Sequence, residues 1–183
     1  MKLLVANRGE IAIRIIRAAA ELNIATVAVS PEDDARSLHT GKADEAVTLD
    51  GVGTAAYLDI EQLITVAKES GCDAVHPGYG FLAENAGFAQ KCEEAGLTFI
   101  GPRVETIDLF GNKARARVAA AAVDVPIIRG IDHAVSPQEA AAFFADLEDG
   151  RAMMIKAVGG GGGRGSRVVE SAAVTRRPGT PRH

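Results

Sequence analysis

A run of five glycines follows a lysine near the end of the chain, in the stretch KAVGGGGGRGSRVV (Lys156–Val169). Glycine lets backbone N–H groups approach phosphate oxygens closely, and a lysine adds a point charge for the same anion. The flanking runs, Met153–Val158 and Ser166–Glu170, are rich in the apolar residues typical of strands. The pattern predicts a glycine loop between two strands that closes over a phosphate. A flexible surface hairpin is the alternative that this stretch alone leaves open.

Two other phosphate motifs do not fit these glycines. Gly160, Gly162 and Gly165 satisfy the spacing G-x-G-x-x-G, but a dinucleotide site needs a helix directly after them, and Ser166–Val169 is strand-like. A P-loop needs lysine and a hydroxyl residue after its last glycine, whereas Ser166 follows Gly165 here. A loop that covers phosphate therefore remains the functional hypothesis.

Two further polar stretches each follow a predicted strand. In HPGYGF (His76–Phe81), Tyr79 is expected to form the wall of a pocket, and His76 to be a hydrogen-bonded structural residue in preference to a proton-transfer group. In Asn7-Arg8-Gly9-Glu10 a strand ends and a helix begins. That position suits an anion, but a helix start capped by Asn7 explains it equally well.

The first hundred residues alternate short apolar runs with amphipathic ones. Strands are predicted at Lys2–Val5, Ala25–Val29, Glu45–Leu49, Asp73–His76 and Thr98–Ile100, and helices at Glu10–Leu22, Ile60–Glu69 and Asn85–Ala95. Such alternation predicts a parallel, doubly wound α/β sheet over residues 1–103, with ligands at the carboxyl ends of its strands.

A second, smaller unit is expected after a helical connector. The connector covers residues 104–125 and is alanine-rich over Val104–Val123. Residues 126–171 then predict a partial α+β lobe: a strand at Pro126–Arg129, a helix opened by the capping box Ser136-Pro137-Gln138-Glu139, and the glycine hairpin. Residues 172–183 are basic and lack periodicity, so they are expected to be a disordered tail.

Net charge, the length of the apolar runs and the cysteine spacing limit the kinds of partner and compartment that the sequence suggests. A net charge of −4 argues against nucleic acid, and no apolar run is long enough to predict a membrane span. Cys72 and Cys92 lack metal or redox spacing and are expected to be buried free thiols, which suits a cytoplasmic protein.

Five ordered motifs resemble the N-terminal part of biotin carboxylase, the ATP-grasp component of biotin-dependent carboxylases, over about residues 1–171. They are VANRGEIAIRIIRAAAELNI (Val5–Ile24), HPGYGFLAENAGFA (His76–Ala89), FIGP (Phe99–Pro102), GNKARAR (Gly111–Arg117) and IKAVGGGGGRG (Ile155–Gly165). The first domain would then be the pre-ATP-grasp domain, and the second part of the small ATP-grasp lobe. The reaction implied is carboxylation of biotin on a carrier protein, with ATP, Mg²⁺ and bicarbonate.

The resemblance also implies roles for individual residues. Lys113 and Lys156 correspond to lysines that contact ATP, Gly162 and Gly163 to loop glycines over its phosphates, and Tyr79 and Gly80 to the side that faces biotin and bicarbonate. Ser166 departs from the pattern, which has methionine there. Arg17 and Glu21 are spaced as an i, i+4 pair, which most often marks a solvated helix face. Because the family is commonly dimeric, the same face could instead meet a second subunit.

The resemblance places no catalytic or metal-binding residue within this chain, because the family has those residues in a later part that finds no counterpart here. The chain is therefore expected to be a truncated piece that is inactive alone, with a carboxyltransferase among the partners of its parent. A non-catalytic remnant or subunit-association module is the alternative. The final acceptor, whether acetyl-CoA, propionyl-CoA, pyruvate or urea, does not follow from these residues.

Overall fold

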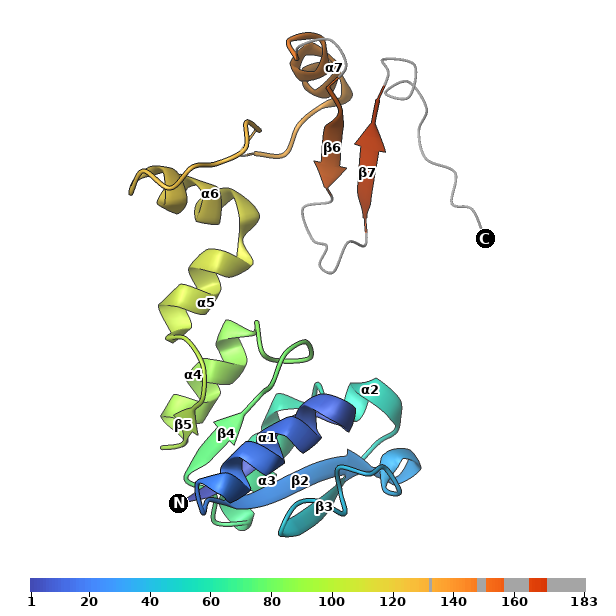
Figure 1. The fold of residues 1–183 in the computed structure, drawn as a ribbon, viewed down its shortest axis with the longest axis vertical. Helices are drawn as coiled ribbons and strands as arrows, with labels where there is room; N and C mark the ends of the chain where they lie inside the picture. The colour runs from blue at the N-terminus through green and yellow to red at the C-terminus, as the bar shows by residue number, and fades with distance from the viewer. Residues whose placement is uncertain (132, 148–150, 157–164, 171–183) are drawn as a thin grey trace. The chain divides into compact units, whose positions relative to one another are not determined.

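The computed structural model describes residues 1–131, 133–147, 151–156 and 165–170, and the chain divides into two units, Met1–Gly111 and Asn112–His183. The first unit is built on a five-stranded sheet with the order β3-β2-β1-β4-β5, in which every neighbouring pair is parallel (Figure 1). Its strands are β1 (Lys2–Val5), β2 (Ala25–Pro31), β3 (Glu45–Leu49), β4 (Ala74–His76) and β5 (Thr98–Phe99). The doubly wound α/β prediction is confirmed.

Helices cover both faces of this sheet. The elements between the strands are α1 (Gly9–Glu21), a 3-10 turn η1 (Glu32–Asp34), α2 (Gly53–Ala56), α3 (Ile60–Glu69) and α4 (Ala86–Glu94). Successive residues of one strand point to opposite faces, so Leu3 and Val5 pack with α1 in one core cluster, whereas Leu4 packs with α3 and α4 in another. Strands buried on both faces read as continuous apolar runs, which is why LLV and TVAV stand out in the sequence.

The predicted helical connector is two helices. α5 (Val104–Gly111) ends the first unit, and α6 (Lys113–Ala121) begins the second. Between them Asn112 adopts an extended backbone, and its side-chain oxygen accepts hydrogen bonds from the N–H groups of Ala114 and Arg115, both at 3.1 Å. Asn112 therefore caps a new helix instead of continuing the preceding one.

The described part of the second unit contains α7 (Pro137–Ala145) and an antiparallel pair, β6 (Met153–Lys156) with β7 (Ser166–Val169). The capping box forms as predicted, with reciprocal hydrogen bonds between Ser136 and Glu139. The small core of the second unit contains three buried residues, Ala140, Met153 and Val169. Three partly buried side chains pack on them: Phe143, Phe144 and Leu147.

The strand expected over residues 126–129 is wrong, because these residues form no ladder. Pro126 has no N–H to donate, and the Ile128 side chain is 87% exposed. Among the described residues, no strand pairs with this segment and no core covers Ile128. Residues 157–164 of the glycine loop and residues 171–183 lie outside the described residues. Closure of the loop over a phosphate and disorder of the tail at 172–183 therefore stay predictions.

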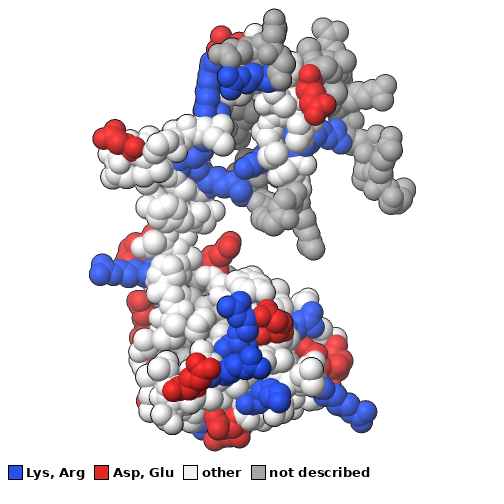
Figure 2. Space-filling model, viewed as in Figure 1, with Lys and Arg blue, Asp and Glu red and all other residues white. Residues whose placement is uncertain are grey.

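Acidic and basic side chains are mixed on the surface of the first unit. Figure 2 shows Lys and Arg interspersed with Asp and Glu on its visible face, without a broad patch of one sign. The described residues include no helix that is both long and apolar enough to cross a membrane.

Candidate functional site

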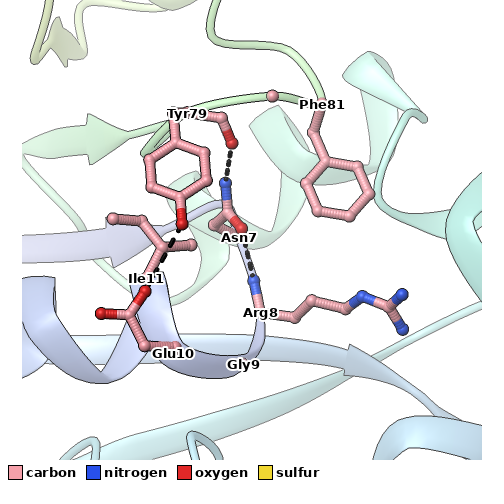
Figure 3. Close-up of a pocket in the computed structure, with 8 residues that line it drawn as sticks. Asn7, Arg8, Gly9, Glu10, Ile11, Tyr79 and Phe81 are labelled. Carbon is pink, nitrogen blue, oxygen red and sulfur yellow. Dashed lines mark hydrogen bonds between the residues drawn. The ribbon is translucent and has the colours of Figure 1, made fainter. Parts of the chain in front are cut away.

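A pocket of about 470 Å³ opens at the carboxyl edge of the parallel sheet. Its two walls are residues 7–11, which follow β1, and residues 79–81, which follow β4 (Figure 3). β1 and β4 are neighbours, and the chain goes from β1 to β2 on one side before it crosses to β4 on the other. The pocket therefore lies at the topological switch point, where open α/β sheets bind ligands.

Asn7 joins the two walls. Its side chain is buried, and its Nδ2 donates to the carbonyl oxygens of Pro77 at 2.7 Å and Tyr79 at 2.9 Å. Its Oδ1 accepts from the N–H of Arg8 at 2.8 Å, while Arg8 itself occupies the N-cap position of α1, and no side chain caps that helix. The alternative in which Asn7 caps the helix is therefore wrong: its amide is used to hold the loop after β4.

Gly78 allows this close approach. Its φ is +68°, and a Cβ atom there would lie 2.7 Å from Asn7 Nδ2. A side chain at this position would displace the Asn7 amide that joins the two walls. Steric exclusion therefore explains why residue 78, the first glycine of HPGYGF, has no side chain.

Tyr79 and Gly80 both line the pocket, as the sequence led us to expect of Tyr79. The Tyr79 side chain is 63% exposed, and its hydroxyl donates a long hydrogen bond to Glu10 Oε2 at 3.4 Å. In Figure 3 the ring of Tyr79 spans from its own wall to the Glu10 carboxylate on the other, while Arg8 extends in the opposite direction. The pocket thus offers an exposed aromatic face with a carboxylate and a guanidinium on its two sides.

Arg8 is held from several directions. Its Nη1 lies 3.4 Å from Asp34 Oδ2, and its guanidinium carbon lies 5.8 Å from the centroid of the Tyr57 ring and 6.0 Å from that of Phe81. Cation–π attraction is effective within about 6 Å of a ring. No local pattern in the sequence points to Asp34 or Tyr57, which lie 26 and 49 positions after Arg8.

The Asp34 carboxylate accepts hydrogen bonds from three side chains. Partial burial acts to raise the pKa of its carboxyl, but hydrogen bonds from Ser37, Tyr57 and Arg8 outweigh burial and lower it. Tyr57 is 1% exposed, and its hydroxyl donates to Asp34 Oδ2 at 2.7 Å. Burial, reinforced by the Asp34 carboxylate, raises the pKa of Tyr57, so its phenol stays a proton donor at neutral pH.

Two histidines stabilise the same region. His76 Nδ1 accepts from the N–H of Gly78 at 3.0 Å, so the hydrogen bond expected of His76 is present, and burial lowers the pKa of His76. His39, which the sequence analysis missed, is fully buried: its Nδ1 accepts from Gly9 N at 3.4 Å and its Nε2 lies 3.1 Å from Val29 O. Since the carbonyl can only accept, the Nε2 of His39 carries the proton.

The expected phosphate-binding residues lie in the second unit. Lys113 is the first residue of α6, and Lys156 is the last of β6, where it pairs with Ser166; both lysines are exposed. Gly162 and Gly163 fall outside the described residues. Within the described residues, no group of three or more His, Cys, Asp or Glu side chains could hold a metal ion. Cys72 and Cys92 are free and buried, as predicted.

These features define a doubly wound α/β domain with its pocket at the switch point. A family model described as "Biotin carboxylase, N-terminal domain" matches residues 1–107, and one described as "Carbamoyl-phosphate synthase L chain, ATP binding domain" matches residues 112–177. The chain belongs to the biotin carboxylase family.

Individual relatives agree with this assignment. Pyruvate carboxylase of Staphylococcus aureus is 54% identical over 92% of this chain, and biotin carboxylase of Halalkalibacterium halodurans is 48% identical over 93%. The chain spans 15% of the first relative's length and 38% of the second's. Among solved structures, the biotin carboxylase domain dimer of Hydrogenobacter thermophilus 2-oxoglutarate carboxylase, in complex with MgADP, ADP and bicarbonate, superposes with a TM-score of 0.88 at 43% identity, over 95% of this chain and 38% of that one.

Proposed function

We propose that this chain supplies the N-terminal part of an enzyme that carboxylates carrier-bound biotin with ATP and bicarbonate. The observation that carries the proposal is the pocket itself, because the two motifs that resemble the family, NRGE and HPGYGF, form its two walls at the switch point. The solved domain dimer with MgADP and bicarbonate supports the same ligands for this chain.

The biotin and bicarbonate side is assigned to Tyr79 and Gly80. The exposed ring of Tyr79 offers a flat apolar surface against which a bicyclic ring could pack, and the positive φ of Gly80, +67°, leaves its backbone open to the pocket. Arg8 adds positive charge to the same pocket, which favours an anion such as bicarbonate. These residues bind and orient, and we assign none of them a proton-transfer step.

The nucleotide phosphates are assigned to Lys113, Lys156, Gly162 and Gly163. Both lysines expose their side chains, which suits contact with a polyphosphate. Bound Mg²⁺ would supply neutralisation of phosphoryl charge. We propose that its ligands lie in a part of the parent enzyme outside this chain, as the resemblance implies.

The test is to titrate the 183-residue chain with MgATP by calorimetry and to assay bicarbonate-dependent ATP cleavage with free biotin. Because we propose that this chain supplies only part of the nucleotide site, we expect a Kd of about a millimolar or weaker and no turnover above background. Lys156→Ala should weaken binding further, whereas Lys42→Ala, which removes an equal charge from an exposed position in the first unit, should not.

Addition of the remainder of a homologous biotin carboxylase in trans should restore cleavage. Turnover by the chain alone, or micromolar ATP affinity that survives Lys156→Ala, would contradict this assignment. Failure of restoration together with undetectable MgATP binding would favour the alternative, a module that only associates with other subunits.

Association is proposed through the exposed side of α1, where Arg17 and Glu21 lie. A biotin carrier protein and a carboxyltransferase are the further partners of the parent enzyme. The homodimer is tested by analytical ultracentrifugation of the chain and of Arg17→Glu, which should shift the equilibrium to monomer; an unchanged dimer would exclude this face.

A further inference from the structure

The Arg8 side chain is fixed more thoroughly than its surface position requires. The side chain is 44% exposed, yet its guanidinium has a carboxylate at 3.4 Å and two aromatic rings within about 6 Å. An exposed arginine normally keeps rotamer freedom, since an isolated surface ion pair contributes little to stability. Its environment therefore selects one orientation.

Asp34 is the centre of this arrangement. It belongs to η1, in the connection between β2 and β3, and accepts hydrogen bonds from Ser37, Tyr57 and Arg8. Ser37 and Tyr57 hold the carboxylate in place from their own segments, so the charge presented to Arg8 has little freedom to move. A charge fixed in this way can orient its partner better than a mobile surface carboxylate can.

Tyr57 extends the arrangement to the opposite wall of the pocket. Its ring centroid lies 5.3 Å from that of Phe81, and Phe81 has a φ of +41°, the left-handed region that non-glycine residues rarely adopt. Phe81 directly follows Tyr79 and Gly80 in the wall. The strained backbone of Phe81 is thus accompanied by a packing contact that holds its ring, and this contact is made by the phenol bonded to Asp34.

We propose that Asp34 is a positioning residue of the pocket: through its bonds to Arg8 and Tyr57 it fixes the guanidinium against the two rings and, with them, the wall formed by residues 79–81. Asp34 does not line the pocket. It acts on a ligand only through Arg8 and Phe81. What the pocket binds rests on the proposed function, but the positioning role is a property of the unliganded chain.

The first measurement follows the Arg8 Nε–H resonance, assigned with Arg8→Lys, in the unliganded 183-residue chain. The two rings should displace this resonance from the position of a free arginine, and Asp34→Asn should return it toward that position. Asp33→Asn is the matched control, because Asp33 accepts from Gly53 N at 3.0 and 3.1 Å and has a separate role. Asp34→Glu should restore part of the displacement.

The second measurement is a spectrophotometric titration of the tyrosines, of which the chain has two. The Tyr57 phenol should ionise at lower pH in Asp34→Asn than in the unaltered chain, because the carboxylate that opposes its ionisation is gone. Thermal unfolding of each variant shows whether these changes occur in a folded protein. If Asp34→Asn does not fold, Tyr57→Phe takes its place: it keeps the ring, removes the hydroxyl bond to Asp34, and should shift the Arg8 resonance in the same direction.

The third measurement connects the network to a ligand. In a titration with sodium bicarbonate against a sodium chloride control, Asp34→Asn should raise the apparent Kd by about tenfold, the effect of losing one well-oriented charged hydrogen bond, and Asp33→Asn should leave it unchanged. Absence of bicarbonate binding by the unaltered chain would contradict the proposed function. An Arg8 resonance that is the same in Asp34→Asn as in the unaltered chain would overturn the positioning role itself.

Discussion

The two units of this chain differ in how completely they bury their own apolar side chains. In the first, the parallel sheet is covered on both faces, and Leu4, Val5, Val27, Val75 and Phe88 are each 0% exposed. In the described part of the second, three residues form the core. Large apolar side chains there remain in solvent, among them Val118, Val123, Ile128 and Met154.

This difference follows from sheet architecture. A parallel sheet obtains covering helices from its own crossover connections, so a hundred residues suffice for a closed core. A two-stranded antiparallel sheet with one helix covers a single face and is marginally stable by itself. We therefore expect the first unit to be more stable than the described part of the second.

The largest expected effect is the loss of stability when a side chain in the core of the first unit is truncated to alanine, compared with truncation of an exposed side chain. Phe88→Ala should lower the free energy of unfolding by about 3–5 kcal/mol, because its ring is fully buried against Phe99 and the α4 side of the sheet. Leu22→Ala, at a side chain 70% exposed, should change it by less than about 0.5 kcal/mol. Urea unfolding followed by circular dichroism measures both, and equal effects would remove the distinction between core and surface on which the comparison rests.

Amide hydrogen exchange compares the local stability of the sheets in the two units. Amides of β1 and β4 should be protected at least about a hundredfold more than those of β6 and β7, a difference of about 2.7 kcal/mol in opening free energy. Exchange of the native chain, followed residue by residue with NMR, gives these factors. Similar protection in both sheets would show that the second unit is as stable as the first.

A glycine pair tests the connection between the pocket walls. Gly78 and Gly96 both have positive φ, +68° and +74°, but an added Cβ meets Asn7 Nδ2 at 2.7 Å in the first case and nothing within 4 Å in the second. Gly96→Ala should cost about 1–2 kcal/mol from backbone strain alone. Gly78→Ala should cost about 1–3 kcal/mol more, because the buried Asn7 amide loses its partners. Equal losses in urea unfolding would mean that Asn7 relaxes without cost.

Two helix caps provide the smallest test. Asn85 caps α4 in the first unit by accepting from Phe88 N at 2.9 Å, and Ser136 caps α7 in the second by accepting from Glu139 N at 3.2 Å. Substitution of either by alanine should remove about 1 kcal/mol. Asn85→Ala should lower protection of β1 and β4, whereas Ser136→Ala should lower only that of β6 and β7; loss of protection in both units from Ser136→Ala would show that they unfold together.

Much of the first unit could be predicted from the sequence, because its signals are local. Alternation of apolar runs and amphipathic stretches predicted every strand of the five-stranded sheet to within two residues. In the second unit, the Ser136–Glu139 capping box, which is also a local signal, formed as expected. The strand at residues 126–129 was wrong for the opposite reason: apolar character suggests a strand, but a strand exists only where a neighbour provides hydrogen bonds. Asn112 likewise interrupts the alanine-rich connector through a cap made by its side chain.

The sequence by itself determined the class of fold, the motifs at the ends of β1 and β4, and the presence of Tyr79 in the pocket wall. Only the tertiary structure decided which side chains those motifs would meet. Asn7 bonds to carbonyls 70 and 72 positions away, and Arg8 finds its carboxylate 26 positions away, in the turn after β2. Secondary structure follows from near neighbours and periodicity, but partners of this kind are brought together by the order of strands in the sheet, which no local pattern encodes.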